Sequence, residues 1–187
     1  MPAATLDFAE LAERLRRVTV EIAGDGASFG CGVLWPRGCV ITNAHVIRRA
    51  RPAVRLFDGT RLEARLVARD GDADLALLSI GDSGLPVATL AQAPARVGSL
   101  VVAVGHPFGV RGALTAGIVH AVGPLVPRGR SWIQADLRLG PGNSGGPLAD
   151  VTGDLVGLNA MVAGGLAIAV PVSRVTAFVQ SAGVATA

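Results

Sequence analysis

The segment at residues 142–147, which reads GNSGGP, carries the strongest chemical signal in this chain. Glycines around a serine allow a tight backbone turn and leave room for a substrate carbonyl to approach the hydroxyl. A serine hydroxyl is a weak nucleophile at its own pKa, so it needs a histidine to accept its proton and a carboxylate to orient the histidine ring. Ser144 is therefore the candidate nucleophile, and its two partners have to come from elsewhere in the chain.

His45 is the best placed of the three histidines to act as the base. It lies in the sequence TNAHV directly after a short apolar run, so its side chain can project from the end of a strand. Asp74 directly precedes the apolar run LALL, whereas Asp70 and Asp72 lie in the turn before it, where we expect them to be solvated. We predict that Asp74 is the buried carboxylate, and that His45, Asp74 and Ser144 form a catalytic triad.

Other kinds of hydrolase fit these motifs less well. A lipase-type nucleophile elbow places its serine between a strand and a helix, but the segment around Ser144 leads into Pro147 instead. Metal-dependent hydrolysis is disfavoured, because no two histidines are close in sequence and no HExxH motif occurs. We therefore expect neither a metal nor another cofactor.

Composition argues against several further classes of protein. The net charge is +3, and all 17 basic residues are arginine. The basic cluster at 48–55 lacks the interleaved aromatic side chains that stack on bases, so we predict no nucleic-acid partner. No apolar run approaches the roughly 20 residues that a membrane-spanning helix needs. The chain begins without a secretory signal, so we expect a cytoplasmic protein, with an exported form whose signal has been trimmed as the alternative.

The elements that must position the three residues are short strands bounded by Gly, Pro or Asp. In the first half, apolar runs occur at 33–34, 40–41, 54–57, 62–68 and 75–80. After a predicted linker at 93–98, a second series follows at 100–104, 114–122, 132–135, 155–161 and 166–170. Both halves are therefore predicted to be all-β.

Two short helices are expected at the ends of the chain. Asp7 and Glu10 have the spacing of a capping box, and the apolar residues that follow recur at helical intervals. Near the end, Pro171 precedes Ser173, a candidate N-cap, and apolar residues again follow at helical spacing. We predict that these helices lie against the strands.

Cys31 and Cys39 are too few for a disulfide framework. If Pro36 and Arg37 form a two-residue hairpin turn, Cys39 faces Leu34 rather than Cys31. We therefore predict two buried free thiols.

Three segments together resemble the HtrA/DegP-type serine proteases of the chymotrypsin fold. They are TNAHV at 42–46, DADLALL at 72–78 and GNSGGPL at 142–148, and the order of His, Asp and Ser also matches. The resemblance extends over about residues 25–175. Because three spaced motifs agree, an ordinary turn around the serine becomes a poor explanation.

This resemblance implies an all-β fold of two antiparallel β-barrels of the chymotrypsin type, with short N- and C-terminal helices. We expect the N-terminal helix and the first barrel, which carries His45 and Asp74, in residues 1–93. The second barrel, with Ser144 and the C-terminal helix, is expected in residues 94–187.

The resemblance also implies an endopeptidase that works through an acyl-enzyme intermediate on unfolded or flexible proteins or on peptides. The oxyanion hole maps onto Gly142, Asn143 and Ser144, with the backbone N–H groups of Gly142 and Ser144 as donors. A catalytically latent member that binds peptides or unfolded chains, in the manner of a chaperone, is the alternative. The intact His45 and Asp74 argue against it.

The substrate pocket of the family maps onto the segment before the nucleophile and onto a later strand. The residues at these positions are Leu139, Gly140, Leu166, Ala167 and Ile168. They are apolar or small, so we predict a small or aliphatic P1 residue. An acidic P1 residue is the alternative if Arg138 points inward.

Two features depart from the family's usual pattern. The chain ends soon after Pro171, so we expect no PDZ module after the protease domain. Members of the family usually trimerise through an N-terminal segment, which here is one short helix, and a homotrimer is the expected candidate assembly.

Overall fold

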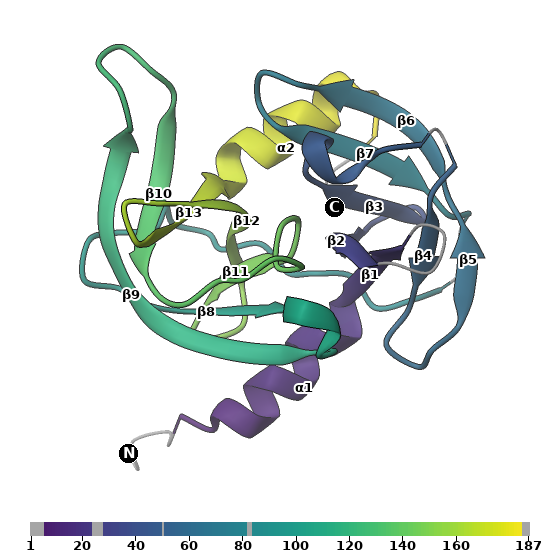
Figure 1. Cartoon of the computed structure of the whole chain (residues 1–187), viewed down its shortest axis with the longest axis horizontal. Coiled ribbons are helices and arrows are strands. Elements are labelled where there is room, and N and C mark those ends of the chain that lie inside the picture. Colours follow the sequence, from purple (N-terminus) through teal and green to yellow (C-terminus); the bar gives the residue numbers. More distant parts are fainter. Residues whose placement is uncertain (1–5, 24–27, 50, 82–83, 185–187) are drawn as a thin grey trace.

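The computed structural model describes residues 6–23, 28–49, 51–81 and 84–184. Two β-sheets stand side by side, and two helices pack against them (Figure 1). The first sheet has seven strands in the order β5-β4-β1-β2-β3-β7-β6. Its strands are β1 (Thr19–Ala23), β2 (Ser28–Trp35), β3 (Cys39–Thr42), β4 (Ala53–Arg55), β5 (Arg61–Glu63), β6 (Arg65–Asp70) and β7 (Leu75–Ser79).

The second sheet is a closed barrel in the order β10-β13-β12-β11-β8-β9. Its strands are β8 (Leu100–Gly105), β9 (Ala113–Pro124), β10 (Ser131–Asp136), β11 (Pro147–Asp150), β12 (Leu155–Ala163) and β13 (Leu166–Pro171). Single 3₁₀ turns, η1 (Ala44–Val46) and η2 (Pro107–Gly109), follow β3 and β8. The predicted all-β architecture is confirmed, with the difference that the first sheet is open where a barrel was expected.

A shared apolar core joins the two sheets. Val33 and Leu77 of the first sheet pack in one buried cluster with Leu158 and Val170 of the barrel. The predicted division between residues 93 and 94 falls in the segment that links β7 to β8. Because burial of this cluster needs both sheets, we expect neither half to be stable alone; the domain division itself stays a prediction.

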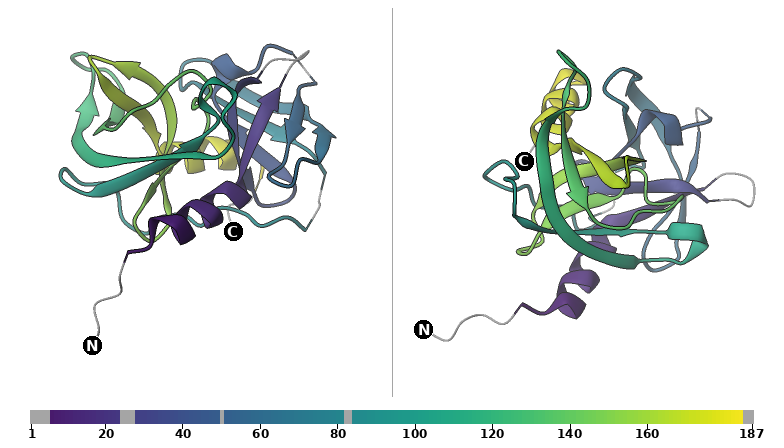
Figure 2. Two further views of the ribbon diagram at one scale, coloured as in Figure 1. Left: turned by 60° about the horizontal axis from the view of Figure 1, so that its bottom comes forward. Right: turned by 60° about the vertical axis from the view of Figure 1, so that its left-hand side comes forward.

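The N-terminal helix α1 (Phe8–Val18) begins as its capping signal predicts. The Asp7 carboxylate accepts hydrogen bonds from the N–H groups of Ala9 and Glu10. Leu11 and Leu15 are buried against Val102, Val104 and Ala149 of the barrel. The helix therefore lies along the barrel wall beneath both sheets (Figure 2).

The C-terminal helix α2 (Val172–Ser181) begins earlier than the sequence suggests. Its N-cap is Pro171 rather than Ser173, because β13 keeps Pro171 in an extended conformation right up to the first helical residue. Val175 and Val179 are buried in the core that joins the sheets. Within the described part of the chain, no helix is both long and apolar enough to cross a membrane.

The hairpin between β2 and β3 differs by one residue from the predicted register. Trp35 pairs with Cys39, so the loop holds three residues rather than two. Arg37 and Gly38 both adopt positive φ angles, of 61° and 63°, and close this longer turn. The prediction of two buried free thiols is nevertheless confirmed for Cys31 and Cys39.

Both thiols are expected to resist modification in the folded protein. Burial raises the pKa of Cys31 far above its ordinary value and also raises the pKa of Cys39. At pH 8 each thiol is therefore protonated and shielded, while the thiolate is the reactive form. Ellman's reagent should detect almost no thiol in the native protein and both thiols in guanidinium chloride. Rapid reaction of the native protein would contradict this expectation.

Candidate active site

Strand pairing brings His45 beside Asp74. Thr42, the last residue of β3, pairs with Ala76 of the antiparallel strand β7. Residues that follow Thr42 therefore meet residues that precede Ala76. The turn η1 continues β3 and the tight turn before β7 ends at Asp74, so both functional side chains stand at the same end of the first sheet.

Asp74 contacts both the ring and the main chain of His45. Its Oδ1 and Oδ2 atoms lie 3.0 and 2.8 Å from Nδ1 of His45, and Oδ1 also accepts a hydrogen bond of 3.0 Å from the His45 N–H. When Nδ1 carries the proton that the carboxylate binds, Nε2 is left as the acceptor. The side chain of Asp74 is 19% exposed and that of His45 is 50% exposed. The carboxylate is thus partly buried rather than fully buried, and the ring remains accessible.

The backbone of Asp74 is held in an unusual conformation. Its φ angle of 54° lies in the left-handed region that few residues other than glycine adopt. The buried Asn43 side chain donates a hydrogen bond of 3.0 Å from Nδ2 to the Asp74 carbonyl. Asn43 therefore fixes the turn that carries the carboxylate. Sequence reasoning missed this role, for which the only signal was an Asn two residues before His45.

Ser144 lies in the loop between β10 and β11, and this loop is bound to both sheets. The Cys31 N–H donates a hydrogen bond of 2.7 Å to the Ser144 carbonyl, and the Gly145 N–H donates one of 2.7 Å to the Asn159 carbonyl. Gly30 lies between Ser144 and the turn η1, because a Cβ atom at Gly30 would come within 2.7 Å of the Ser144 carbonyl and 2.8 Å of Val46. Ser144 and His45 thus belong to neighbouring loops at the junction of the sheets.

The Ser144 hydroxyl donates to the main chain of β12. Its Oγ atom lies 2.9 Å from the Ala160 carbonyl oxygen. Among the described residues, no hydrogen bond joins Ser144 to His45. The structure therefore brings together His45 and Asp74 directly, and it shows the hydroxyl of Ser144 hydrogen-bonded to the Ala160 carbonyl rather than to His45.

Gly145 is needed at its position for two separate reasons. Its φ angle is +83°, and a Cβ atom there would overlap the Cys31 carbonyl and the Thr42 hydroxyl. We expect Gly145→Ala to lower the free energy of unfolding by about 3–5 kcal/mol, since backbone strain and overlap add.

Gly59→Ala is the matched control for Gly145→Ala. Gly59 has a φ angle of +91° but no atom within 4 Å of the added Cβ. Strain alone should cost about 1–2 kcal/mol there. Urea unfolding of both variants measures the difference, and equal losses would show that the overlap at Gly145 contributes nothing.

Backbone N–H groups of the loop before Ser144 are available to bind an oxyanion. The Pro141 carbonyl accepts a hydrogen bond of 3.0 Å from the Phe108 N–H. The Pro141 carbonyl and the Gly142 N–H belong to the same trans peptide group, in which C=O and N–H point in opposite directions. The Gly142 N–H therefore points away from Phe108. Among the described residues, the N–H groups of Gly142 and Ser144 donate to no protein acceptor, whereas the Asn143 N–H donates to the Gly140 carbonyl at 3.1 Å. Of the three residues predicted for the oxyanion hole, Gly142 and Ser144 therefore have a backbone N–H that is free of any described protein acceptor.

The Cys31 thiol also forms a hydrogen bond with this loop. Its Sγ atom donates to the Gly142 carbonyl at 2.9 Å, and the His106 N–H donates to that carbonyl at 3.3 Å. Because burial raises the pKa of the Cys31 thiol, the sulfur keeps the proton that this contact requires. Sequence reasoning placed Cys31 only among the buried thiols, and nothing in its local pattern indicated a contact across 111 positions of chain.

A pocket of about 390 Å³ adjoins Ser144. Its walls come from the loop before the nucleophile and from β12: Leu139, Gly140, Pro141, Asn143, Ser144, Ala160, Met161 and Val162. Two of the residues predicted to bind substrate, Leu139 and Gly140, therefore line the pocket that adjoins Ser144.

Leu166, Ala167 and Ile168 do not line this pocket. They belong to β13, which pairs with the pocket strand β12, and Ala167 and Ile168 are buried. Arg138 is exposed and is also absent from the pocket walls, so the structure gives no support to an acidic P1 residue.

Comparison with known proteins identifies the relatives of the chain. Residues 30–158 match the trypsin-like peptidase domain family. A protein of Ectopseudomonas mendocina (strain ymp), named probable periplasmic serine endoprotease DegP-like, is 41% identical over 143 residues, which are 74% of this chain and 30% of that protein. A protein of the same name from Hahella chejuensis (strain KCTC 2396) is 39% identical over 151 residues, 79% of this chain and 32% of that protein. The chain spans about a third of the length of these relatives.

Solved structures share the fold. The HtrA-type protease AlgW with a tripeptide has a TM-score of 0.85 and 32% identity, and the match covers 94% of this chain and 63% of that one. The serine endoprotease from Yersinia pestis has a TM-score of 0.85 and 28% identity, over 96% of this chain and 68% of that one. The resemblance to HtrA/DegP-type proteases and the chymotrypsin-type fold are thereby confirmed.

The relatives contradict the expected location. Both proteins from Ectopseudomonas mendocina and Hahella chejuensis are named periplasmic, so the prediction of a cytoplasmic protein is wrong. It rested on the absence of a secretory signal from the printed sequence, and that absence is a weaker guide than the family.

Proposed function

Because the chain belongs to the trypsin-like peptidase domain family, we propose that it is a serine endopeptidase that cleaves unfolded or flexible proteins. The observation that carries the proposal is the contact of Asp74 with both the ring and the main chain of His45. A histidine held in this way exposes Nε2 as a base beside a glycine-flanked serine. The relatives named serine endoprotease support the same activity.

In the proposed reaction, the Ser144 hydroxyl first turns from the Ala160 carbonyl towards His45. Its Oγ atom attacks the scissile carbonyl while Nε2 of His45 takes the hydroxyl proton. The N–H groups of Gly142 and Ser144 stabilise the negative oxygen of the tetrahedral intermediate. His45 then gives the proton to the leaving amine, and an acyl-enzyme remains. Water activated by His45 hydrolyses the ester and restores Ser144.

A fluorophosphonate probe tests this proposal directly. The wild-type chain should become labelled, with the added mass on the peptide that contains Ser144, and it should digest casein. Treatment with the probe should abolish the digestion. Label on another serine, or casein digestion that survives full labelling, would contradict the assignment of Ser144.

The pocket beside Ser144 supports a small or aliphatic P1 residue. Among the described residues, its wall contains no carboxylate, so a lysine or arginine side chain would be desolvated there without a partner. We expect kcat/KM for peptides with Ala, Val or Leu at P1 to exceed that for Lys or Arg by about tenfold or more. A panel of chromogenic peptides measures this ratio, and a preference for basic residues would refute the prediction.

One observation favours a second function, that of a latent peptide-binding protein. The Ser144 hydroxyl donates to Ala160 rather than to His45, as expected for a site at rest. A latent protein should suppress aggregation of an unfolded protein equally well before and after Ser144→Ala, and it should show no fluorophosphonate labelling. Labelling of the wild type decides for the peptidase.

We propose that the chain acts in the periplasm, as its named relatives do. Its substrates would then be unfolded proteins of that compartment. Cell fractionation of the native host measures the location. The homotrimer expected from the family stays a prediction, which sedimentation velocity of the purified chain can check.

A further inference from the structure

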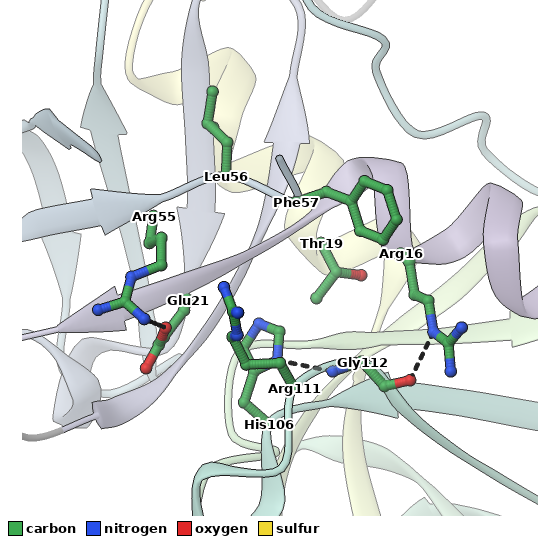
Figure 3. A pocket seen from close by; sticks show the side chains of 9 residues that line it. All are labelled: Arg16, Thr19, Glu21, Arg55, Leu56, Phe57, His106, Arg111 and Gly112. Carbon is green, nitrogen blue, oxygen red and sulfur yellow. Dashed lines mark hydrogen bonds and ion pairs between the residues drawn. The ribbon is translucent and has the colours of Figure 1, made fainter. Parts of the chain in front are cut away.

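A second pocket of about 260 Å³ shares no lining residue with the pocket beside Ser144. It is enclosed by α1, by β1 and the end of β4, and by the loop that joins β8 to β9. Figure 3 shows Glu21 and Arg55 paired on one side of the pocket, Arg16 against the Gly112 carbonyl on the other, and His106 and Arg111 between them. None of these residues takes part in the proposed reaction.

His106 supplies an unused hydrogen-bond donor to this pocket. Only 7% of the residue is exposed, and the Gly112 N–H donates a hydrogen bond of 3.0 Å to its Nδ1 atom. Burial, the largest influence, lowers the pKa of His106, so the ring is neutral near pH 7. Since Nδ1 is an acceptor, the hydrogen of the neutral ring is on Nε2. Nε2 is buried and has no partner in the described part of the chain.

The pocket also has one positive charge in excess. Arg55 pairs with the buried Glu21 at 3.3 Å, and Arg16 pairs with Glu13. Arg111 is exposed and forms no hydrogen bond or ion pair with any described residue. Arg111, whose guanidinium is unpaired, and His106, whose buried Nε2–H has no partner among the described residues, therefore line the same cavity.

Two hydrophobic side chains complete the wall of the pocket. Leu56 is almost fully buried there, and Phe57 is half exposed at the rim. The volume is below the range typical of sites for drug-sized ligands, so the occupant must be small.

We propose that this pocket binds a small monocarboxylate with an apolar substituent. Its carboxylate is held by Arg111 and by the Nε2–H group of His106, and its apolar part lies against Phe57. A guanidinium binds a carboxylate through two parallel hydrogen bonds, which suits this ligand. A dianion such as phosphate fits less well, because Arg55 and Arg16 are already paired with carboxylates and Arg111 alone can compensate only one of its two charges.

His106 connects this pocket with the loop before Ser144, which carries the proposed oxyanion donors. The side chain of His106 faces the pocket, while its main-chain N–H donates to the Gly142 carbonyl at 3.3 Å. A ligand that fixes His106 therefore contacts the residue that also holds Gly142.

Calorimetric titration of the 187-residue chain with benzoate tests the proposal. Benzoate should bind saturably to one site. Benzamide, which has the same ring without the charge, and inorganic phosphate should each bind about tenfold more weakly or worse. Absence of saturable benzoate binding would overturn the proposal, and so would benzamide or phosphate binding as tightly as benzoate.

Two variants locate the binding. Arg111→Gln should weaken benzoate binding about tenfold or more, because the ligand loses its charged partner. The control Arg96→Gln removes an exposed arginine from the loop before β8 and should change the affinity less than about twofold. Equal affinities of wild type and Arg111→Gln, or equal losses in both variants, would overturn the assignment.

A nuclear magnetic resonance measurement checks the role of His106 without altering a buried residue. Benzoate should shift the imidazole ¹⁵N signals of His106 and leave those of His120, which is exposed on β9, in place. Shifts at His120 alone would place benzoate elsewhere and refute the site.

Discussion

Ser144→Ala is expected to lower kcat for peptide hydrolysis by about 10⁶-fold, since the other groups cannot replace the attacking oxygen. The fold should survive. The hydroxyl contributes one partly buried hydrogen bond, to the Ala160 carbonyl, and its loss costs about 1 kcal/mol. Steady-state kinetics with a chromogenic peptide measure the rate, and urea unfolding measures the stability.

Ser173→Ala is the matched control for this variant. Ser173 is an exposed serine in the first turn of α2, away from the walls of the pocket beside Ser144. The Ser173→Ala variant should retain wild-type kinetics and fluorophosphonate labelling. If Ser144→Ala kept more than about a thousandth of the wild-type kcat, Ser144 could not be the nucleophile.

Asp74→Asn is expected to lower kcat about 10⁴-fold at neutral pH. An amide of the same shape preserves the packing, but it offers Nδ1 of His45 a group that can donate. The ring then favours the tautomer with its hydrogen on Nε2, which cannot accept the proton of Ser144. The hydrogen bond from the His45 N–H to Oδ1 can remain, so we expect little loss of stability.

Asp72→Asn separates this effect from a general loss of negative charge. The Asp72 side chain is 88% exposed, and its one ion pair with a described residue is to the partly exposed Arg130, so removal of its charge should change kcat less than about twofold. Initial rates of both variants across pH 6–9 provide the comparison. Similar losses in both would show that Asp74 acts through bulk charge and not by orienting His45.

The local elements of this protein follow from short-range patterns in its sequence. Asp7 begins α1 because its carboxylate caps the first turn, and the spacing of Leu11 and Leu15 gives that helix its buried face. Apolar runs bounded by turn residues predict most of the strands. The β2–β3 register was one residue off, since two successive positive φ angles at Arg37 and Gly38 make a longer turn than the pattern indicated.

The candidate triad could be named from sequence because each member lies in a motif of its own at a strand end. The pocket could not be mapped to the right strand in this way. Both β12 and β13 are rich in apolar residues, and Met161 pairs directly with Ile168. Only the tertiary structure shows that Met161 lines the pocket while Ile168 is buried.

The sequence by itself determined the family, the all-β class and the three residues proposed for the reaction, because these depend on residue type and local spacing. The tertiary structure decided which groups hold the loop around Ser144. The thiol of Cys31 reaches the Gly142 carbonyl, and the side chain of His106 faces a separate pocket. Such contacts arise when two sheets pack against each other, and no local pattern encodes a hydrogen bond between residues that only packing brings together.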